Sequence, residues 1–238
     1  PVLFALLLGC SSDASALGPV EFEAGASLLS KYVWRGAILT DEPVLQPSVT
    51  AGFMGLSLNL WGNVDLTDYK NEQSSLSEID YTLTWSGNLV LGELSAGAVL
   101  YTFPTIEGAD PTTELILGLE TFLPGSPALT IYQDIDRADG TYILLGAGQS
   151  VPLGMPPKLD VSASIGWGSA SHNRYNYGVA GMKSACTDAA VTLGMPFGLG
   201  ETFSVAPTVS YILRVNKDMR DAYDTGTVVF GVTASAGF

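Results

Sequence analysis

The end of the chain reads Thr227-Val-Val-Phe-Gly-Val-Thr-Ala-Ser-Ala-Gly-Phe238 and alternates between apolar and small or polar side chains. Successive side chains of a β-strand point to opposite faces. Val228, Phe230 and Phe238 therefore share one apolar face, whereas Thr227 and Thr233 lie on the other. The segment has about the length of a strand that crosses a bilayer at a tilt. The fold class then depends on whether the rest of the chain repeats this pattern.

Other segments do repeat it, and the clearest is residues 77–86, where Ile79, Tyr81 and Leu83 alternate with Glu78 and Asp80. Turn-forming residues separate these segments. Together with the final segment, the predicted strands cover residues 21–35, 45–53, 56–65, 77–86, 91–102, 113–121, 128–136, 141–151, 158–168, 184–195, 202–213 and 227–238.

The composition agrees with strands that have one apolar and one polar face. Charged residues make up 14% of the chain, and the mean hydropathy is +0.29. No long apolar run follows the first residues, so helical membrane spans are not expected. Short turns alternate with mostly longer connections, and both termini fall on the short-turn side, as in outer-membrane barrels. We therefore predict an all-β fold, a closed antiparallel membrane-spanning barrel of about twelve strands over residues 17–238.

A soluble β-sandwich is the alternative for strands at this spacing, but nearly every strand here has a polar face without core residues. A strand that closes on an aromatic residue, as at Phe238, is similar to the assembly signal of bacterial outer-membrane barrels. Membrane lipid and the barrel assembly machinery are the partners expected from it. Aromatic residues near strand ends are predicted to form two interfacial girdles: Tyr32, Trp34, Phe53, Trp85, Trp167, Phe203, Tyr211 and Phe238.

The first residues are expected to be an export signal rather than part of the fold. An apolar run at residues 2–9 is followed by small residues up to Ala16, which predicts a truncated signal peptide over residues 1–16. Leu7-Leu8-Gly9-Cys10 also matches a lipidation motif, so lipid attachment at Cys10 is the alternative. Either processing route predicts an exported protein located in the bacterial outer membrane. No disulfide is expected, since cleavage leaves Cys186 alone.

Charge and motifs exclude several functions. The net charge is −14, which argues against nucleic acid as a partner, because phosphate binding needs clustered Lys and Arg. The sequence shows no cofactor motif and no zinc or EF-hand spacing. Calcium at Asp218, Asp221 and Asp224 is a weak alternative to simple solvation. The chain has one His, His172, which we expect on a loop surface, so a barrel enzyme with a Ser–His pair is not favoured.

Five short blocks in the first third of the chain form an ordered set. They are SKYVWRG at residues 30–36, DEP at 41–43, LQP at 45–47, LWGNVD at 60–65 and EIDY at 78–81. These blocks, in this order, resemble the TorF family of proteobacterial porins. The resemblance implies an outer-membrane barrel that forms a pore with no assigned substrate, and it supplies no catalytic residues.

The inward faces of the strands predict what the pore would admit. They carry many carboxylates and few basic groups, so we expect a passive diffusion channel for small polar solutes that prefers cations. Inward Gly and Ser residues, such as Gly146, Ser162 and Ser164, favour open space. The alternative is an interior plugged by pairing of carboxylates with Lys31 and Arg35, in a non-conducting structural or loop-binding barrel. If Arg35 faces Glu78 and Asp80, it sets a transverse field at a constriction. The candidate lumen residues are Lys31, Arg35, Asp65, Glu78, Asp80, Glu114, Glu120, Asp134, Asp136, Asp160 and Asp188.

Overall fold

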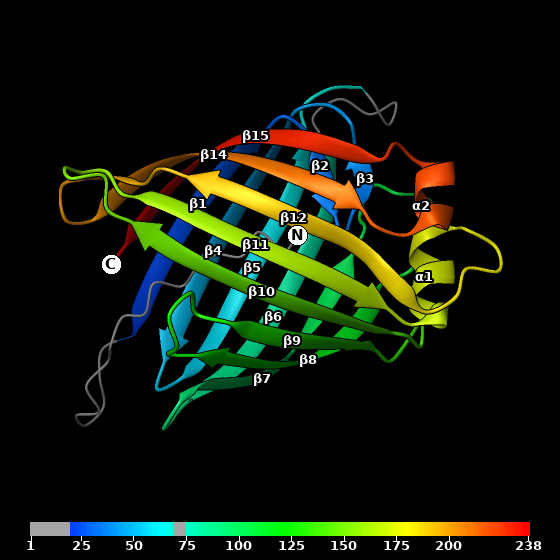
Figure 1. Cartoon of the computed structure of the whole chain (residues 1–238), viewed down its shortest axis with the longest axis horizontal. Coiled ribbons are helices and arrows are strands. Elements are labelled where there is room, and N and C mark those ends of the chain that lie inside the picture. Colours follow the sequence, from blue (N-terminus) through cyan, green and yellow to red (C-terminus); the bar gives the residue numbers. More distant parts are fainter. Residues whose placement is uncertain (1–19, 69–74) are drawn as a thin grey trace.

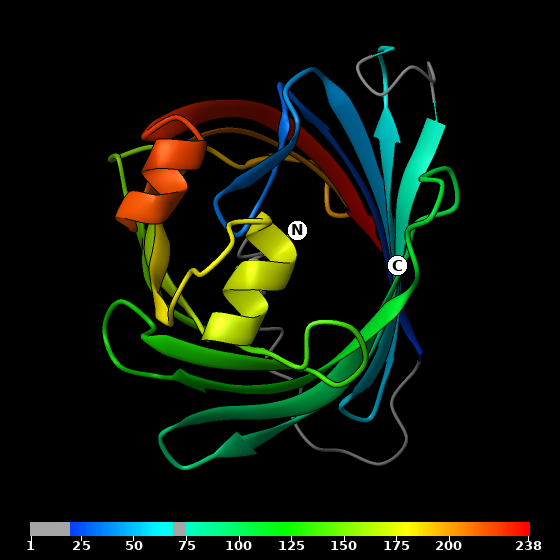
Figure 2. The same cartoon turned by 90° about the vertical axis from the view of Figure 1, so that its right-hand side faces the viewer.

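The computed structural model describes residues 20–68 and 75–238, which form a closed antiparallel β-barrel. The predicted signal peptide lies outside the described residues. Figures 1 and 2 show the barrel from the side and along its axis. Twelve strands make the wall: β1 (Glu21–Leu29), β4 (Val44–Phe53), β5 (Leu56–Asp65), β6 (Ser75–Leu89), β7 (Gly92–Thr102), β8 (Thr112–Thr121), β9 (Ala128–Asp134), β10 (Thr141–Val151), β11 (Leu159–Gly168), β12 (Ala185–Gly194), β14 (Phe203–Arg214) and β15 (Gly226–Gly237).

Each wall strand pairs with its neighbours along the chain, and the barrel closes where β1 meets β15. At the end of this seam the Phe22 N–H donates to the Phe238 carbonyl over 3.1 Å, and the Phe238 N–H donates to the Phe22 carbonyl over 2.8 Å. Closure leaves no free edge on the wall, which is what a barrel that spans a membrane requires. The predicted twelve-strand barrel is confirmed.

The alternation predicted from the sequence separates an apolar outer face from a polar lumen. Leu58 and Phe230, which point outward, are 55% and 62% exposed, whereas Asp80 and Glu114, which point inward, are 3% and 2% exposed. Pro47 marks an irregularity as expected: residues 46 and 47 have no register partner on β5. No helix in the described part of the chain is long and apolar enough to cross a membrane.

The two ends of the barrel differ. Five connections make the short-turn end: residues 54–55, 90–91, 122–127, 152–158 and 195–202, the last of which includes β13 (Phe197–Leu199). At Met54 and Gly55 both φ angles are positive, as a two-residue hairpin turn requires. The opposite, long-loop end carries the hairpin of β2 (Tyr32–Trp34) and β3 (Ala37–Thr40), the helix α1 (Ala170–Tyr177) and the helix α2 (Lys217–Ala222).

Two expected strands end earlier than predicted. The first strand ends at Leu29, and the chain then turns into the barrel as the β2–β3 hairpin, with positive φ at Arg35 and Gly36. Tyr32 and Trp34 are therefore inside the barrel, and their predicted place in an outer aromatic girdle is wrong. Similarly, β9 ends at Asp134, so Asp136 lies in an exposed loop rather than on the inward face.

Candidate functional site: the barrel lumen

The tip of the β2–β3 hairpin inserts Arg35 into the lumen. Its Nη1 and Nη2 donate to the two carboxylate oxygens of Glu114 on β8, each over 2.7 Å. The guanidinium carbon lies 4.4 Å from the ring centroid of Trp34, 4.6 Å from that of Tyr132 and 4.3 Å from that of Tyr142. A planar guanidinium fits such a site because it can bind a carboxylate in bidentate fashion and stack on aromatic faces at once. This contact fastens the hairpin tip to the wall.

The carboxylate partner of Arg35 differs from the one that we expected. Glu78 instead accepts a hydrogen bond from the Tyr32 hydroxyl over 2.8 Å, and Glu114 accepts a third one from the Tyr101 hydroxyl over 2.8 Å. The expected pairing of Arg35 with Glu78 and Asp80 is therefore corrected, because the hairpin turn carries Arg35 beyond β6 to β8.

The rest of the hairpin is held by further polar contacts. The Thr40 hydroxyl donates to Asp65 Oδ1 over 2.8 Å. The Tyr177 hydroxyl of α1 donates to the Arg35 carbonyl over 2.9 Å, and Arg214 Nε donates to the Gly36 carbonyl over 2.8 Å. The hairpin is thus bound on its side chains and on its backbone. Figure 2 shows α1 lying across the long-loop opening, beside the hairpin.

His172 belongs to this packed region, and the predicted surface position is wrong. Its side chain is fully buried, with ring centroids 5.2 Å from Tyr142 and 6.1 Å from Trp34. Its Nδ1 lies 3.1 Å from the Asn176 side-chain amide. Burial first, and then the charge of Arg35, lower the pKa of His172 to about 3. A neutral, enclosed imidazole fits a packing role.

Tyr142 of β10 and Asp188 of β12 meet over Gly166 of β11, on the inner face of the wall. The Tyr142 hydroxyl lies 3.0 Å from Asp188 Oδ1, which also accepts a hydrogen bond from the Thr187 hydroxyl over 2.7 Å. Gly166 leaves room for this pair, because a Cβ there would lie 2.0 Å from the Tyr142 hydroxyl oxygen.

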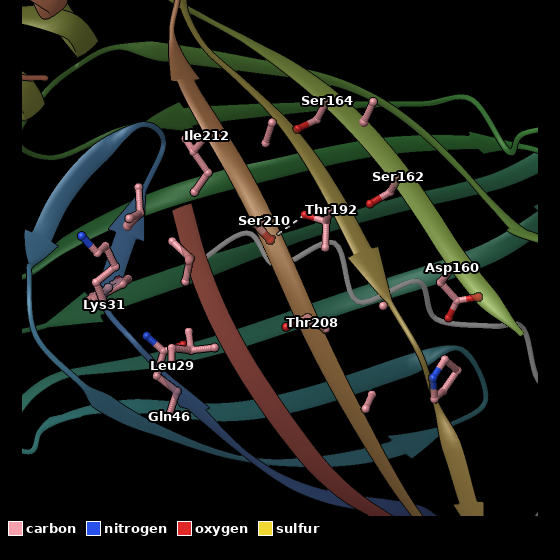
Figure 3. A pocket seen from close by; sticks show the side chains of 18 residues that line it. Leu29, Lys31, Gln46, Asp160, Ser162, Ser164, Thr192, Thr208, Ser210 and Ile212 are labelled. Atoms are coloured by element: carbon pink, nitrogen blue, oxygen red, sulfur yellow. Dashed lines mark hydrogen bonds between the residues drawn. The ribbon is translucent and has the colours of Figure 1, made fainter. Parts of the chain in front are cut away.

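The hairpin fills one side of the lumen and leaves a cavity of about 230 Å³ along the other. The hairpin tip contacts β8, β9 and β10, whereas the cavity runs along β11, β12 and β14 and is bordered by the hairpin base. Figure 3 shows the hydroxyl groups that face it. The hydroxyl groups of Thr192 and Ser210 share a hydrogen bond of 2.7 Å. The lining combines polar and apolar residues in similar numbers. The polar ones are Lys31, Tyr32, Gln46, Asp160, Ser162, Ser164, Thr192, Thr208 and Ser210, and the apolar ones are Leu29, Val33, Ala163, Ala190, Pro196, Ala206, Ile212 and Val229.

The remaining predicted lumen residues are spread over different surroundings. Lys31 forms an ion pair with Asp41, and Asp160 lies at the cavity and accepts a hydrogen bond from Ser150. Glu120 is half-buried and faces Glu93 across the β7–β8 ladder.

Asp134 serves the connection that follows β9. Its Oδ1 accepts backbone hydrogen bonds from Asp136, Arg137 and Ala138 over 2.8–3.0 Å. Its carboxylate therefore orders this loop. Among the described residues, no group of three His, Cys, Asp or Glu side chains is arranged to hold a metal ion.

Sequence reasoning missed the aromatic and basic residues that enclose the hairpin. Tyr101, Tyr132 and Tyr142 all stand on inward strand positions, and that parity was the signal that could have found them. Arg214 gave no such signal, because its partner is a backbone carbonyl more than a hundred residues away in the chain.

The fold defines a closed antiparallel β-barrel of twelve wall strands with a polar lumen. The chain belongs to the bacterial family of unknown function Gcw_chp, whose model matches residues 13–235. The resemblance to the TorF family stays a prediction. No curated protein matches the chain.

Solved outer-membrane barrels are similar to the chain at low identity. A double variant of OccD1 (OprD) is 12% identical, with a TM-score of 0.42, over 92% of this chain and 65% of its own length. OprB of Pseudomonas putida, in its high-pH structure, is 12% identical, with a TM-score of 0.37, over 82% of this chain and 59% of its own. The β domain of the Bordetella autotransporter BrkA is 10% identical, with a TM-score of 0.34, over 92% of this chain and 98% of its own. The chain therefore spans less than two thirds of the first two neighbours.

Proposed function

We propose that this protein is an outer-membrane channel through which small polar solutes diffuse passively. The observation that carries the proposal is the cavity beside the hairpin, which runs between Asp160 near the short-turn end and Ile212 near the long-loop end and is lined in part by five Ser and Thr residues. A lumen wall of Ser and Thr residues can replace part of a solute's hydration shell as the solute moves. Export, insertion by the barrel assembly machinery and an outer-membrane location belong to this proposal.

Cation preference is the second part of the proposal, and the inward carboxylates support it unequally. Glu114 is neutralised by Arg35, and Asp134 binds the backbone of its own loop. Asp160 lies on the cavity itself, where Lys31 is already paired with Asp41. We therefore assign the selectivity to Asp160.

A block placed in the cavity tests the proposed path. Thr192 points into the cavity, whereas its chain neighbour Val191 points outward and is 48% exposed. We expect Thr192→Trp to lower single-channel conductance in a planar bilayer by roughly half or more, because the indole occupies the conducting space. Val191→Trp is the matched control and should conduct like the wild type. Equal conductance of all three proteins would contradict the path along β12.

A non-conducting barrel is the second candidate, and one observation favours it. Arg35 is 5% exposed, so the hairpin and α1 are packed tightly at the long-loop end. If the folded wild type is silent in the bilayer but a variant without residues 31–41 conducts, the hairpin is a plug and the second candidate holds.

A salt gradient across the same bilayer tests the proposed cation preference. An anion-preferring reversal potential would reject the assignment of the selectivity to Asp160.

A further inference from the structure

The turns at the short-turn end are unusual because their exposed tips are apolar. Val90 and Leu91 are 94% and 74% exposed, and Met155 is 76% exposed. Met54, Phe122 and Leu123 are exposed as well. Turns that face water are normally built from Gly, Pro, Asn, Asp and Ser, and large exposed apolar patches mark an interaction surface.

The apolar tips surround the barrel instead of gathering on one side. Each of the five short turns carries at least one: Met54 after β4, Val90 after β6, Phe122 after β8, Met155 after β10 and Leu199 after β12. The strand order places these turns around the whole circumference. A protein partner of ordinary size would cover one sector of this rim, whereas a lipid leaflet surrounds it.

Charged residues are rare in the turns of the short-turn end and common in the connections of the long-loop end. Within the five short turns, the charged residues are Lys158 and Glu201. The carboxylates on the strands near this end stand on inward positions of the ladders: Glu21, Glu23, Glu93, Glu120 and Asp160. The described long-loop connections are charged throughout, with Asp136, Arg137 and Asp139 in one loop and five charged residues in residues 215–225.

We infer that the short-turn rim is immersed in the lipid leaflet, with its apolar tips among the acyl chains and glycerol groups rather than in water. The tips continue the outward apolar rows of the wall, such as Leu56 and Leu58 beyond Met54, so the lipid-contacting surface extends to the end of the barrel. The charged long-loop end then projects from the opposite leaflet. This inference rests on the proposed membrane location and adds how deep the barrel sits and which end is submerged.

Nitroxide accessibility in vesicles tests the inference. Single cysteines replace Val90 and Met155 in the full chain, in a background where Cys10 and Cys186 are changed to serine. Glu107→Cys, in an exposed long-loop connection, and Leu117→Cys, at an outward position in the middle of β8, are the controls. Each spin-labelled protein is reconstituted into phosphatidylcholine vesicles, and power saturation is measured with oxygen, which concentrates in lipid, and with a water-soluble nickel chelate.

We expect labels at positions 90 and 155 to collide mainly with oxygen, as at position 117, and the label at 107 to collide mainly with the nickel chelate. Nickel accessibility at 90 and 155 equal to that at 107 would overturn the inference and place the rim in water. Shielding from both reagents would also overturn it, in favour of a protein contact. If the label at 117 is accessible to nickel as well, the proposed membrane location fails together with the inference, so the two failures are distinguishable.

Discussion

Arg35 carries a permanent charge into an interior where leaving it alone would be costly. Its bidentate pair with Glu114 and its three aromatic neighbours compensate for the water that it loses. Removing one partner of such a pair leaves a buried charge, which costs far more than the pair itself contributes. The contact therefore fixes where the hairpin lies more than it adds to stability.

Arg35→Ala should accordingly destabilise the barrel by about 3–5 kcal/mol, measured by urea unfolding in vesicles. The double change Arg35→Met with Glu114→Leu should recover most of that loss, because no charge is then left unpaired. The exposed ion pair of Arg137 with Asp110 offers the control, and Arg137→Ala should cost about 1 kcal/mol or less. If Arg35→Ala costs no more than Arg137→Ala, the pair does not anchor the hairpin.

His172 predicts a pH dependence of stability at the same site. Its pKa falls from 6.5 to about 3 on burial, so between these values the unfolded chain binds the proton and the folded chain does not. Stability is then full above about pH 6.5 and decreases as the pH falls towards 3, with a slope of up to about 1.4 kcal/mol per pH unit. Urea unfolding between pH 7.5 and 5, which lies above most carboxylate pKa values, should show this loss in the wild type and not in His172→Gln. Parallel curves would mean that His172 is solvated in the folded state.

At the scale of elements, the sequence was sufficient for the wall and insufficient for what fills it. The period of two in segments such as 77–86 determines which side chains face outward, because a slip of one residue would exchange the two faces. The hairpin β2–β3 gave no comparable signal: residues 31–35 keep the same alternation as β1, so they read as its continuation. What separates them is the positive φ at Arg35 and Gly36 and a set of partners on β6 and β8 that lie far away in the chain.

The short helix α1 illustrates the same limit of prediction from the sequence. The helix α1 begins after Ser169, whose hydroxyl accepts a hydrogen bond from the His172 N–H, and Ser is a common N-cap residue. Eight residues of helix are too few to be stable alone, so α1 depends on its contacts with Trp34, Tyr142 and the hairpin backbone. Contacts of this kind appear once the barrel has closed, and a reading of local sequence cannot supply them.

At the scale of the whole molecule, closure depends on one seam that joins the two ends of the described chain. The β1–β15 ladder runs from Leu29 and Gly231 to Glu23 and Gly237, and the paired hydrogen bonds between Phe22 and Phe238 extend it by one further step. The Phe238 side chain is 73% exposed, so it contributes to the outer surface and not to the lumen. Deletion of Phe238 would shorten the seam and would also remove an apolar side chain from the outer surface.

We therefore expect deletion of Phe238 to lower the fraction of protein that reaches the membrane in folded form severalfold, as judged by heat-modifiable mobility on gels of isolated membranes. Phe238→Leu keeps both backbone hydrogen bonds and changes the ring alone, so it separates the seam from the aromatic side chain. Phe203→Ala, at another exposed aromatic position near the same end, controls for a general loss of apolar surface. Normal insertion of the shortened chain would show that the barrel closes without this last pair. Failure of Phe238→Leu to the same degree as the deletion would instead assign the effect to recognition of the aromatic ring by the assembly machinery, because the hydrogen bonds of the seam are intact in that variant.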